Sequence, residues 1–259
     1  MKKVWIAGAN GQLGKSLQDV VKQYSASKNE YHFLSREDLD ISNPKQVSSF
    51  FSMNSVDCLV NCAAYTAVDK AETEVEKAFA INAEGVKNLA KNCQLQNAEL
   101  IHISTDYVFD GMASRPYLPK DSPNPINVYG KSKLEGEKQA IENNSKTIVI
   151  RTSWVYSEYG TNFHKTMLRL MAEREEIRVV SDQIGKPTYA GDLAKYIFDL
   201  IENESSDYGI HHFSGKEQMS WYEFAVKIAK ENQFTTRIIP ISTEEFPTPA
   251  KRPKWSVLG

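Results

Sequence analysis

The chain has 259 residues, of which 41% are hydrophobic, and this is enough to bury a full core in one domain with or without a smaller lobe. Its 31 Lys and Arg residues nearly balance 33 Asp and Glu residues, so no strong basic field exists to hold nucleic acid or an anionic membrane. Three cysteines (Cys58, Cys62 and Cys93) make a poor disulfide framework, and the apolar run 4–7 is too short for a signal peptide or a membrane span. These features predict a reducing, cytoplasmic setting.

Short apolar runs alternate with longer helical periods, a pattern that predicts an α/β fold with a parallel sheet. In the first part of the chain, strands are predicted over residues 3–7, 31–34, 58–61, 100–104 and 147–151, and helices over 12–23, 44–53, 74–93 and 129–143. Six or seven strands in this order indicate a Rossmann-like doubly wound sheet.

The second half of the chain is less regular. Helices are predicted over 162–173, 190–202 and 220–232, and strands over 177–180 and 210–213. Ser220 and Glu223 have the spacing of a capping box at the start of the last helix. We expect these pieces to form a smaller C-terminal lobe over one edge of the sheet.

A glycine-rich turn, Gly8-Ala9-Asn10-Gly11-Gln12-Leu13-Gly14, joins the first predicted strand to the first helix. Gly8 permits a tight turn, Gly11 lets the backbone approach a pyrophosphate, and Gly14 allows the helix to pack closely on the strand. The free N–H groups at the start of the helix would then meet the pyrophosphate. A plain strand–turn–helix connection is the alternative, because the glycine spacing differs from the commonest dinucleotide fingerprint.

The second strand ends at Ser35-Arg36-Glu37-Asp38, about where an adenosine ribose would lie. Arg36 favours NADPH because a guanidinium can bind the 2′-phosphate, although Glu37 and Asp38 would repel it and a solvated surface arginine is the alternative. The preference is therefore modest and NADH use stays open. Asp40 and Ile41 are candidates to hold the adenine.

Tyr129 and Lys133 stand four residues apart on a predicted helix, so their side chains share a face. A lysine ammonium lowers the pKa of a neighbouring tyrosine and makes it a better proton donor near neutral pH. Thr105 follows the fourth strand at its C-terminal end, where open α/β sheets bind ligands. The Tyr129/Lys133 pair alone is weak evidence for catalysis, but together with the glycine turn and Thr105 it predicts a hydride-transfer site.

Several stretches across nearly the whole chain carry a family resemblance: GANGQLG from Gly8, NCAAYTAVDKAE from Asn61, STDYVFDG from Ser104, YGKSKLEGE from Tyr129, RTSWVY from Arg151, DQIGKPTYAGDLA from Asp182 and TPAKRPKWS from Thr248. The chain resembles the extended short-chain dehydrogenase/reductase family and, within it, the dTDP-4-dehydrorhamnose reductases. The glycine turn and the Tyr/Lys pair occur throughout the superfamily, whereas YTAVDKAE, STDYVFDG and DQ-G-PTY are more specific to this group.

The resemblance implies that the chain reduces the C4 ketone of dTDP-4-dehydro-L-rhamnose to dTDP-L-rhamnose with NADPH or NADH, in nucleotide-sugar and cell-surface polysaccharide biosynthesis. Residues 1–155, completed by a helix and strand around 190–215, would be the dinucleotide-binding domain, and 156–189 and 216–259 the substrate-binding lobe. Relatives usually continue past the position of Gly259, so a truncated chain is one expectation.

The same resemblance assigns roles to single residues. Tyr129 would be the general acid, Lys133 its partner and a ribose contact, and Thr105 the third catalytic residue. The expected cofactor-binding residues are Gly8, Asn10, Gly11, Gln12, Leu13, Gly14, Arg36, Asp40, Ile41, Cys62, Ala63, Ala64, Tyr129 and Lys133. The expected substrate-binding residues are Thr66, Val68, Thr105, Asp106, Tyr129 and Trp154. Arg151, Lys186 and Arg252 are candidates for the diphosphate, and Asn82 is a candidate for an asparagine that the wider superfamily often uses.

Several alternatives stay open. Trp154 and Val68 could be ordinary core residues, and Asp69 and Lys70 a solvated pair. The enzyme could reduce another nucleotide-linked 4-keto-deoxysugar, or the chain could be a non-catalytic NADP-binding subunit similar to the regulatory β-subunit of methionine adenosyltransferase. Some relatives form homodimers around magnesium, which leaves a homodimer open; no metal site is predicted here, because the first helix has no acidic residue before Asp19.

Overall fold

The computed structural model describes residues 1–24 and 27–259. Its centre is a six-stranded parallel sheet in the order β10-β5-β4-β3-β1-β2, which confirms the Rossmann-like doubly wound α/β prediction. The strands are β1 (Lys3–Ala7), β2 (Glu30–Leu34), β3 (Cys58–Asn61), β4 (Glu99–Thr105), β5 (Thr147–Thr152) and β10 (Gly209–His212). Buried strands of this kind alternate their side chains between two covered faces.

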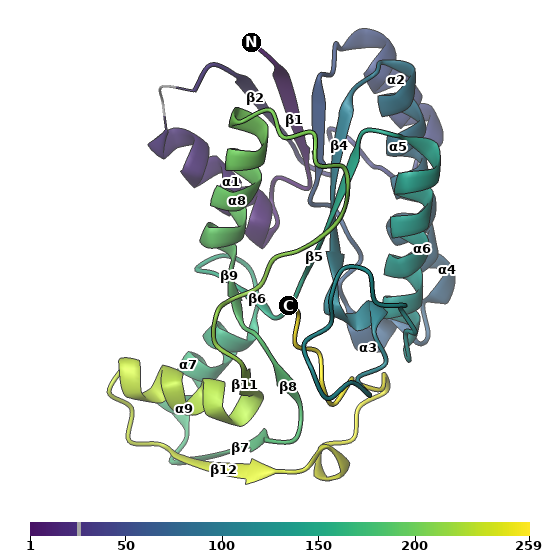
Figure 1. Cartoon of the computed structure of the whole chain (residues 1–259). Coiled ribbons are helices and arrows are strands. Elements are labelled where there is room, and N and C mark those ends of the chain that lie inside the picture. Colours follow the sequence, from purple (N-terminus) through teal and green to yellow (C-terminus); the bar gives the residue numbers. More distant parts are fainter. Residues whose placement is uncertain (25–26) are drawn as a thin grey trace.

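Helices cover both faces of the sheet (Figure 1). On one face lie α2 (Pro44–Met53), α5 (Gly85–Leu95) and α6 (Val128–Asn143), and on the other lie α1 (Gln12–Gln23) and α8 (Ala190–Glu202). Within β1, Val4 and Ile6 pack toward α1 and α8, whereas Ala7 packs into the opposite core with α2 and α5. The two cores are therefore separated by the sheet and fix the helices on either side of it.

The helix expected over 74–93 is divided into three segments. These are α4 (Val75–Phe79), the π-helix η1 (Ala80–Glu84) and α5, and a short helix α3 (Val68–Ala71) precedes them. Asn82 lies in the π-helical turn. Its side-chain oxygen accepts a hydrogen bond from the Tyr65 N–H at 2.8 Å, and its side-chain nitrogen donates one to the Tyr65 carbonyl oxygen at 3.0 Å. A π-helical turn inside a longer helix is a local distortion that periodicity does not reveal.

A smaller lobe lies at the end of the sheet (Figure 1). It consists of α7 (Phe163–Glu173), β7 (Glu176–Val180), α9 (Trp221–Glu231) and β12 (Arg237–Ile241) around a core of its own. Ser220 caps α9 and Glu223 completes the predicted capping box. Strand β12, which pairs in parallel with β7, was absent from the sequence prediction.

Short strands and the C-terminal segment connect the lobe to the sheet. The strand β6 (Val155–Tyr156) pairs with β9 (Thr188–Tyr189), and β8 (Ile184–Gly185) pairs with β11 (Met219–Ser220). Two single-turn helices, η2 (Asp106–Val108) and η3 (Thr243–Glu245), complete the elements. The C-terminal residues return to the sheet, where Tyr117 donates its N–H to Val257 at 2.8 Å. Among the described residues, no helix has both the length and the apolar character needed to cross a bilayer.

Candidate active site

The glycine turn has the geometry that a close backbone approach requires. Gly8 has φ +82°, and a Cβ there would lie 2.6 Å from the backbone nitrogen of Ala63. A Cβ on Gly14 would lie 2.4 Å from the Gly8 carbonyl oxygen, so the third glycine allows the start of α1 to pack on the turn. Gly11 is the N-cap of α1 and supplies no side chain to its free N–H groups. The turn therefore leaves those donors available for an anionic ligand.

A cavity of about 260 Å³ opens beside this turn. Its walls come from the glycine turn, the residues after β2 and the end of β3, namely Gly8, Asn10, Gly11, Arg36, Leu39, Asp40, Ile41, Cys62, Ala63, Ala64 and Ile81. The predicted cofactor residues from three separate strands thus meet in one place. Their polar rim and narrow apolar walls fit the adenosine half of a dinucleotide.

Arg36 lies at the open edge of this cavity. Its side chain is 71% exposed and its guanidinium nitrogen Nη2 lies 3.2 Å from Asp40 Oδ2. Asp40 in turn accepts a hydrogen bond of 2.6 Å from Ser42. An exposed arginine that already has a carboxylate partner is a weak anion site, because solvent screening and the partner both reduce its pull on a phosphate.

A second cavity, of about 460 Å³, follows the C-terminal ends of the central strands. We call it the catalytic cavity. It contains all three predicted catalytic residues and most of the predicted substrate contacts. Gln12 and Leu13 of the glycine turn also line it. The lining includes Gly11, Gln12, Leu13, Cys62, Ala64, Thr66, Thr105, Asp106, Tyr129, Lys133 and Trp154. Val68, the first residue of α3, is not among the residues that line it.

Tyr129 belongs to the first turn of α6, whose N-cap, Asn127, accepts a hydrogen bond from the Gly130 N–H at 2.7 Å. Burial raises the pKa of Tyr129 to about 12, while a hydrogen bond with Thr105 opposes the rise. The Tyr107 ring lies edge-on to the Tyr129 ring, with centroids 5.7 Å apart. The phenol is therefore protonated at neutral pH and lies beside the threonine.

Lys133 is fully enclosed below Tyr129, with only 2% exposure. Its ammonium donates a hydrogen bond of 2.5 Å to the carbonyl oxygen of Ile103 on β4. Burial lowers the pKa of Lys133 to about 8, and Glu137 opposes that change. The lowered Tyr129 pKa that the sequence analysis expected is not found in this arrangement, because burial outweighs the other influences and the pKa is raised. The Lys133 ammonium itself donates to Ile103.

The side of the catalytic cavity where the sugar is expected combines one buried acid, Asp106, with a stacked indole, Trp154. Burial raises the pKa of Asp106 to about 7, and its Oδ1 accepts a hydrogen bond of 3.0 Å from Thr105. Trp154 has φ +49°, which is unusual for a large residue, and its ring stacks on Trp221 of α9 at 3.4 Å between centroids. Gly185 provides the space for that ring, since a Cβ there would lie 2.5 Å from the indole.

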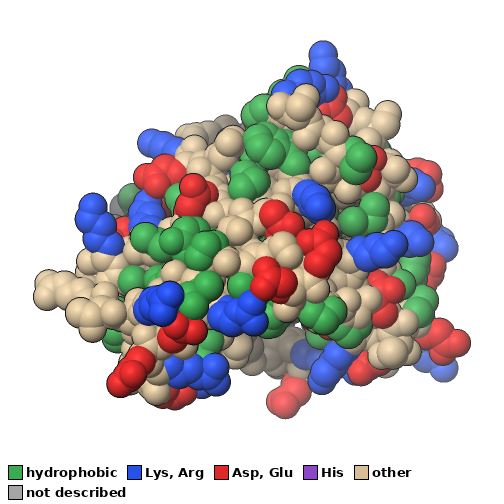
Figure 2. All heavy atoms as spheres, turned by 90° about the horizontal axis from the view of Figure 1, so that it is seen from below, with side chains coloured by type: hydrophobic (Ala, Val, Ile, Leu, Met, Phe, Trp, Pro, Cys, Tyr) green, Lys and Arg blue, Asp and Glu red, His purple; other side chains and the backbone are tan. Residues whose placement is uncertain are grey.

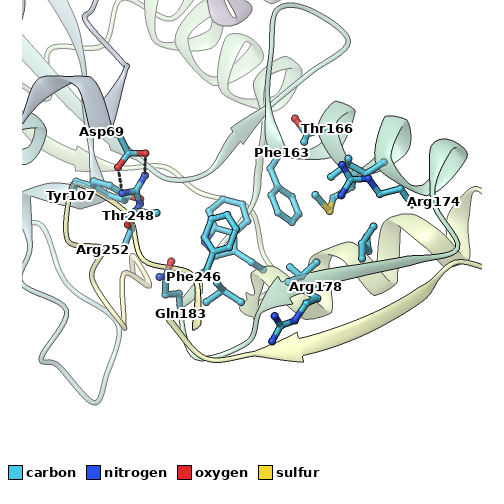
Figure 3. Close-up of a pocket in the computed structure, with 16 residues that line it drawn as sticks. Asp69, Tyr107, Phe163, Thr166, Arg174, Arg178, Gln183, Phe246, Thr248 and Arg252 are labelled. Atoms are coloured by element: carbon cyan, nitrogen blue, oxygen red, sulfur yellow. Dashed lines mark hydrogen bonds and ion pairs between the residues drawn. The ribbon is translucent and has the colours of Figure 1, made fainter. Parts of the chain in front are cut away.

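A third cavity, of about 490 Å³, lies in the lobe. We call it the lobe cavity; Figure 3 shows the Asp69–Arg252 pair beside Tyr107 at one end and Arg174 and Arg178 toward the other. Its middle is apolar and aromatic, with Phe163, Met167, Leu170, Ile177, Val179, Trp221 and Phe246. Tyr107 and Trp221 line this cavity, and their partners Tyr129 and Trp154 line the catalytic cavity. The two cavities are thus neighbours across two aromatic contacts.

The lobe cavity holds functional candidates that the sequence analysis missed. Phe163, Arg174, Arg178 and Trp221 lie outside the stretches that carry the family resemblance, and Phe246 stands two residues before the stretch that begins at Thr248. Tyr107, in contrast, stands two residues after Thr105 within the stretch STDYVFDG, and that proximity was an available signal. Basic and acidic side chains are interspersed over the face that includes the lobe, and neither sign dominates it (Figure 2).

Two of the three candidate diphosphate ligands are excluded by their positions. Arg151 is 1% exposed and forms a buried ion pair with Glu137, so its assignment was wrong. Lys186 donates to the carbonyl oxygen of Leu258 at 2.7 Å and lines none of the three cavities. Arg252 does line the lobe cavity, where it binds both carboxylate oxygens of Asp69. Asp69 is therefore paired with Arg252 and not with Lys70. No group of three or more metal-binding side chains occurs among the residues described.

Comparison with known proteins gives a consistent result. The whole chain, residues 1–259, matches the family model described as RmlD substrate binding domain. The dTDP-4-dehydrorhamnose reductase of Aggregatibacter actinomycetemcomitans is 43% identical, over 100% of this chain and 90% of that protein. The spore coat polysaccharide biosynthesis protein SpsK of Bacillus subtilis is 41% identical, over 100% and 89%. The crystal structure of dTDP-4-dehydrorhamnose reductase from Bacillus anthracis in complex with NADP superposes with a TM-score of 0.95, at 45% identity over 100% of this chain and 90% of that one.

Proposed function

The chain belongs to the RmlD substrate binding domain family of extended short-chain dehydrogenase/reductases, and we propose that it reduces dTDP-4-dehydro-L-rhamnose to dTDP-L-rhamnose with NADPH. The observation that carries this proposal is the meeting of Tyr129, Lys133 and Thr105 in one cavity that begins at the glycine turn. This cavity lies beside a second one in the lobe, so cofactor and sugar nucleotide have adjoining places.

In this reaction the carbonyl at C4 becomes a secondary alcohol by gaining one hydride and one proton. The bound reduced nicotinamide supplies the hydride and is left oxidised. Tyr129 donates the proton to the oxygen that develops negative charge, and a buried phenol with a raised pKa is in the protonated form that this step needs. Thr105, which contacts Tyr129, orients the substrate oxygen toward the same proton.

Lys133 has two tasks in this proposal. Its ammonium lowers the cost of the negative charge left on Tyr129, since a positive neighbour stabilises a phenolate. It also binds the ribose of the cofactor, for which its position between the glycine turn and Tyr129 is suited. Solvent then returns a proton to Tyr129 and closes the cycle.

Different residues around the cofactor cavity bind different parts of the dinucleotide. Gly8, Asn10, Gly11, Gln12 and Leu13 bind the pyrophosphate and the region next to it, while Gly14 allows α1 to pack closely. Arg36, Asp40 and Ile41 bind the adenosine end. Cys62, Ala63 and Ala64, which follow β3, form the wall between the adenosine end and the catalytic cavity.

We assign the nucleotide of the substrate to the lobe cavity. Its aromatic and apolar middle suits a pyrimidine base, and Arg252 near the catalytic cavity suits a diphosphate. Thr66, Asp106 and Trp154 then surround the sugar. Val68, the first residue of α3, lines none of the three cavities and has no direct contact in this assignment. In this assignment residues 1–155 and 190–215 form the dinucleotide-binding domain, which also contributes Thr66, Asp106 and Trp154 to the sugar site. Residues 156–189 and 216–259 form the substrate-binding lobe.

The test is a direct assay of the purified chain. NADPH oxidation is followed by absorbance after addition of dTDP-4-dehydro-L-rhamnose prepared enzymatically from dTDP-glucose, and the product is identified by mass spectrometry and NMR. We expect stoichiometric formation of dTDP-L-rhamnose. If NADPH is oxidised only with another nucleotide-linked 4-keto-deoxysugar, that sugar nucleotide is the substrate. If the chain binds NADPH but oxidises it with none of these sugar nucleotides, the chain is a binding subunit.

A further inference from the structure

Helix α6 presents a stripe of three functional groups to strand β4. Tyr129, Lys133 and Glu137 are spaced four residues apart and therefore lie on one face of the helix. Lys133 bonds the carbonyl of Ile103, and Glu137 accepts a hydrogen bond from Ser104 at 2.5 Å. Tyr129 contacts Thr105, the next residue of the strand. The third member of this stripe, Glu137, has no place in the reaction as described above.

The carboxylate of Glu137 is held from two sides. Arg151 on β5 donates from Nε to Oε1 at 2.9 Å and from Nη2 to Oε2 at 2.7 Å. Ser104 supplies the hydrogen bond from β4. Glu137 and Arg151 are 2% and 1% exposed, and the guanidinium lies 5.0 Å from the centre of the Phe109 ring. A buried ion pair of this kind adds little net stability compared with well-packed apolar residues, so a purely structural purpose explains it poorly.

Few charges face the Lys133 ammonium. Glu137 acts on it from α6, Cys62 from the position directly after β3, and His102 from β4. Tyr129 lies one turn earlier on α6. Burial raises the pKa of Cys62 to about 12 and lowers the pKa of His102 well below its usual value, so both are neutral near pH 7. Asp106 acts on Tyr129 from the far side of the cavity. Arg151 lies beyond Glu137, whose carboxylate is the negative charge one turn from the lysine.

We propose that Glu137 is a positioning residue: its carboxylate, fixed by Arg151 and Ser104, keeps the buried Lys133 ammonium charged and directed along β4 behind Tyr129. This inference rests on the proposed role of Lys133 in the reductase reaction. Without the carboxylate, nothing of comparable size would oppose the effect of burial on the Lys133 pKa, and the lysine would lose its proton at lower pH. A neutral lysine cannot stabilise the phenolate of Tyr129.

The experiment compares wild type with Glu137→Gln, which keeps the size of the side chain and its hydrogen-bonding atoms. The pKa of Lys133 is measured by NMR titration of isotopically labelled lysine side chains, with the Lys133 signal identified by its loss in Lys133→Met. We expect a decrease of about one pH unit from the wild-type value of about 8. At pH 8 this corresponds to about fivefold lower kcat, with KM for the sugar nucleotide nearly unchanged.

Glu135→Gln is the matched control, because Glu135 lies on the same helix and bonds Gln139 at the surface. It should leave the Lys133 titration at the wild-type value. A loss of thermal stability in Glu137→Gln with an unshifted Lys133 pKa would overturn the proposal in favour of a structural role. If that variant does not fold, the double variant Glu137→Leu/Arg151→Met, which replaces the pair by apolar groups, is used instead. An unchanged Lys133 pKa in the double variant also overturns the proposal.

The NMR titration separates this inference from the proposed function. It needs neither substrate nor turnover, so a shifted Lys133 pKa supports the positioning role even if the sugar nucleotide proves to be different. Absence of reductase activity in the wild type would instead refute the proposed function. A shifted Lys133 pKa with an unchanged alkaline limb of the pH–activity profile would show that Glu137 controls the lysine but that the lysine charge does not limit the reaction. That result would overturn the part of the inference that concerns catalysis.

Discussion

In the catalytic cavity, the chemical groups are enclosed and are held by elements of the central sheet. Lys133 is 2% exposed and bonded to β4, and Tyr129 is flanked by Thr105 and Tyr107. In the lobe cavity, two arginines lie at the rim, whereas Arg252 is 18% exposed and paired with Asp69. Arg174 and Arg178 are exposed, and Arg178 pairs with Glu245 on a neighbouring turn. The apolar side chains between them come from α7, β7 and α9, and from Phe246 directly after η3.

This difference suggests that the catalytic cavity carries out the reaction and that the lobe cavity recognises the substrate. Groups held by a rigid sheet and helix keep the geometry that the transition state requires, so their loss should lower kcat. Exposed arginines around an apolar pocket act on the bound and activated substrate alike, so their loss should raise KM. Variants in the two cavities test whether the molecule divides its work in this way.

The largest effect is expected for Tyr129→Phe, which removes the proton donor and leaves the ring. Loss of a general acid costs a factor of roughly 10² to 10⁴ in rate. We expect kcat to fall by that factor while NADPH binding, measured by fluorescence titration, changes little. Tyr159→Phe is the control, since that hydroxyl bonds Asp19 at the surface. More than a tenth of wild-type turnover in Tyr129→Phe would exclude this tyrosine as the acid.

Lys133→Met tests the ionisation behind the alkaline limb of the pH profile. The protonated lysine is the active form, so wild-type kcat/KM should fall as the pH rises through about 8, where Lys133 loses its proton. The variant should be much slower and should lack this limb, because its next ionisation is that of Tyr129 at about 12. The measurement is kcat/KM from about pH 6 to about pH 10, a range that spans the Lys133 value of about 8 and stays below the Tyr129 value of about 12. A limb that remains near 8 in Lys133→Met would assign it to another group.

Sequence reasoning was most accurate for the sheet, where hydrophobic pattern and turn chemistry agree. The strands β1 and β3 and the helices α1, α2 and α8 begin and end at the predicted residues. The lobe was less predictable. In β12 the sequence Arg-Ile-Ile-Pro-Ile contains a proline, which argues against a strand, yet β12 pairs with a single neighbour and tolerates it at an edge. The two-residue strands β6, β8, β9 and β11 are too short to have a period.

The candidate site was predicted where residues follow a strand or share a helix face. Thr105, Tyr129 and Lys133 meet as expected because the ends of parallel strands lie together. Arg151 was placed wrongly because a strand buried on both faces gives no sign of which way a side chain points. The lobe cavity could not be assembled from sequence, since its lining joins residues from Asp69 to Arg252 through tertiary contacts alone.

Arg252→Ala should produce an intermediate effect in the lobe cavity. Charge-assisted hydrogen bonds contribute about 1.5–3 kcal/mol, so we expect KM for the sugar nucleotide to rise by about ten- to a hundredfold with kcat nearly unchanged. Arg252 also bonds Asp69, which could account for part of the effect. Asp69→Ala separates the two roles in the same kinetic assay. Equal rises in KM in both variants would show that the ion pair itself matters and that Arg252 does not bind the diphosphate.

The smallest effect is expected at the rim of the cofactor cavity, with Arg36→Ala. The guanidinium can bind the 2′-phosphate of NADPH and has no phosphate to meet in NADH. Its side chain is 71% exposed and already lies 3.2 Å from Asp40, so screening and this partner reduce its contribution. An exposed charged hydrogen bond contributes about 1.4 kcal/mol or less, which is a factor of ten at most.

We therefore expect wild type to prefer NADPH by no more than about tenfold and Arg36→Ala to lose that preference. The measurement is kcat/KM for NADPH and NADH in both proteins. The NADH value should stay nearly constant, because the two cofactors differ only in the 2′-phosphate and the proposed contacts at the glycine turn would not change. Equal decreases for the two cofactors would mean that Arg36 stacks on the adenine or holds the loop through Asp40. In that case the preference for NADPH must come from another residue of this cavity, since only a group that meets the 2′-phosphate can distinguish the two.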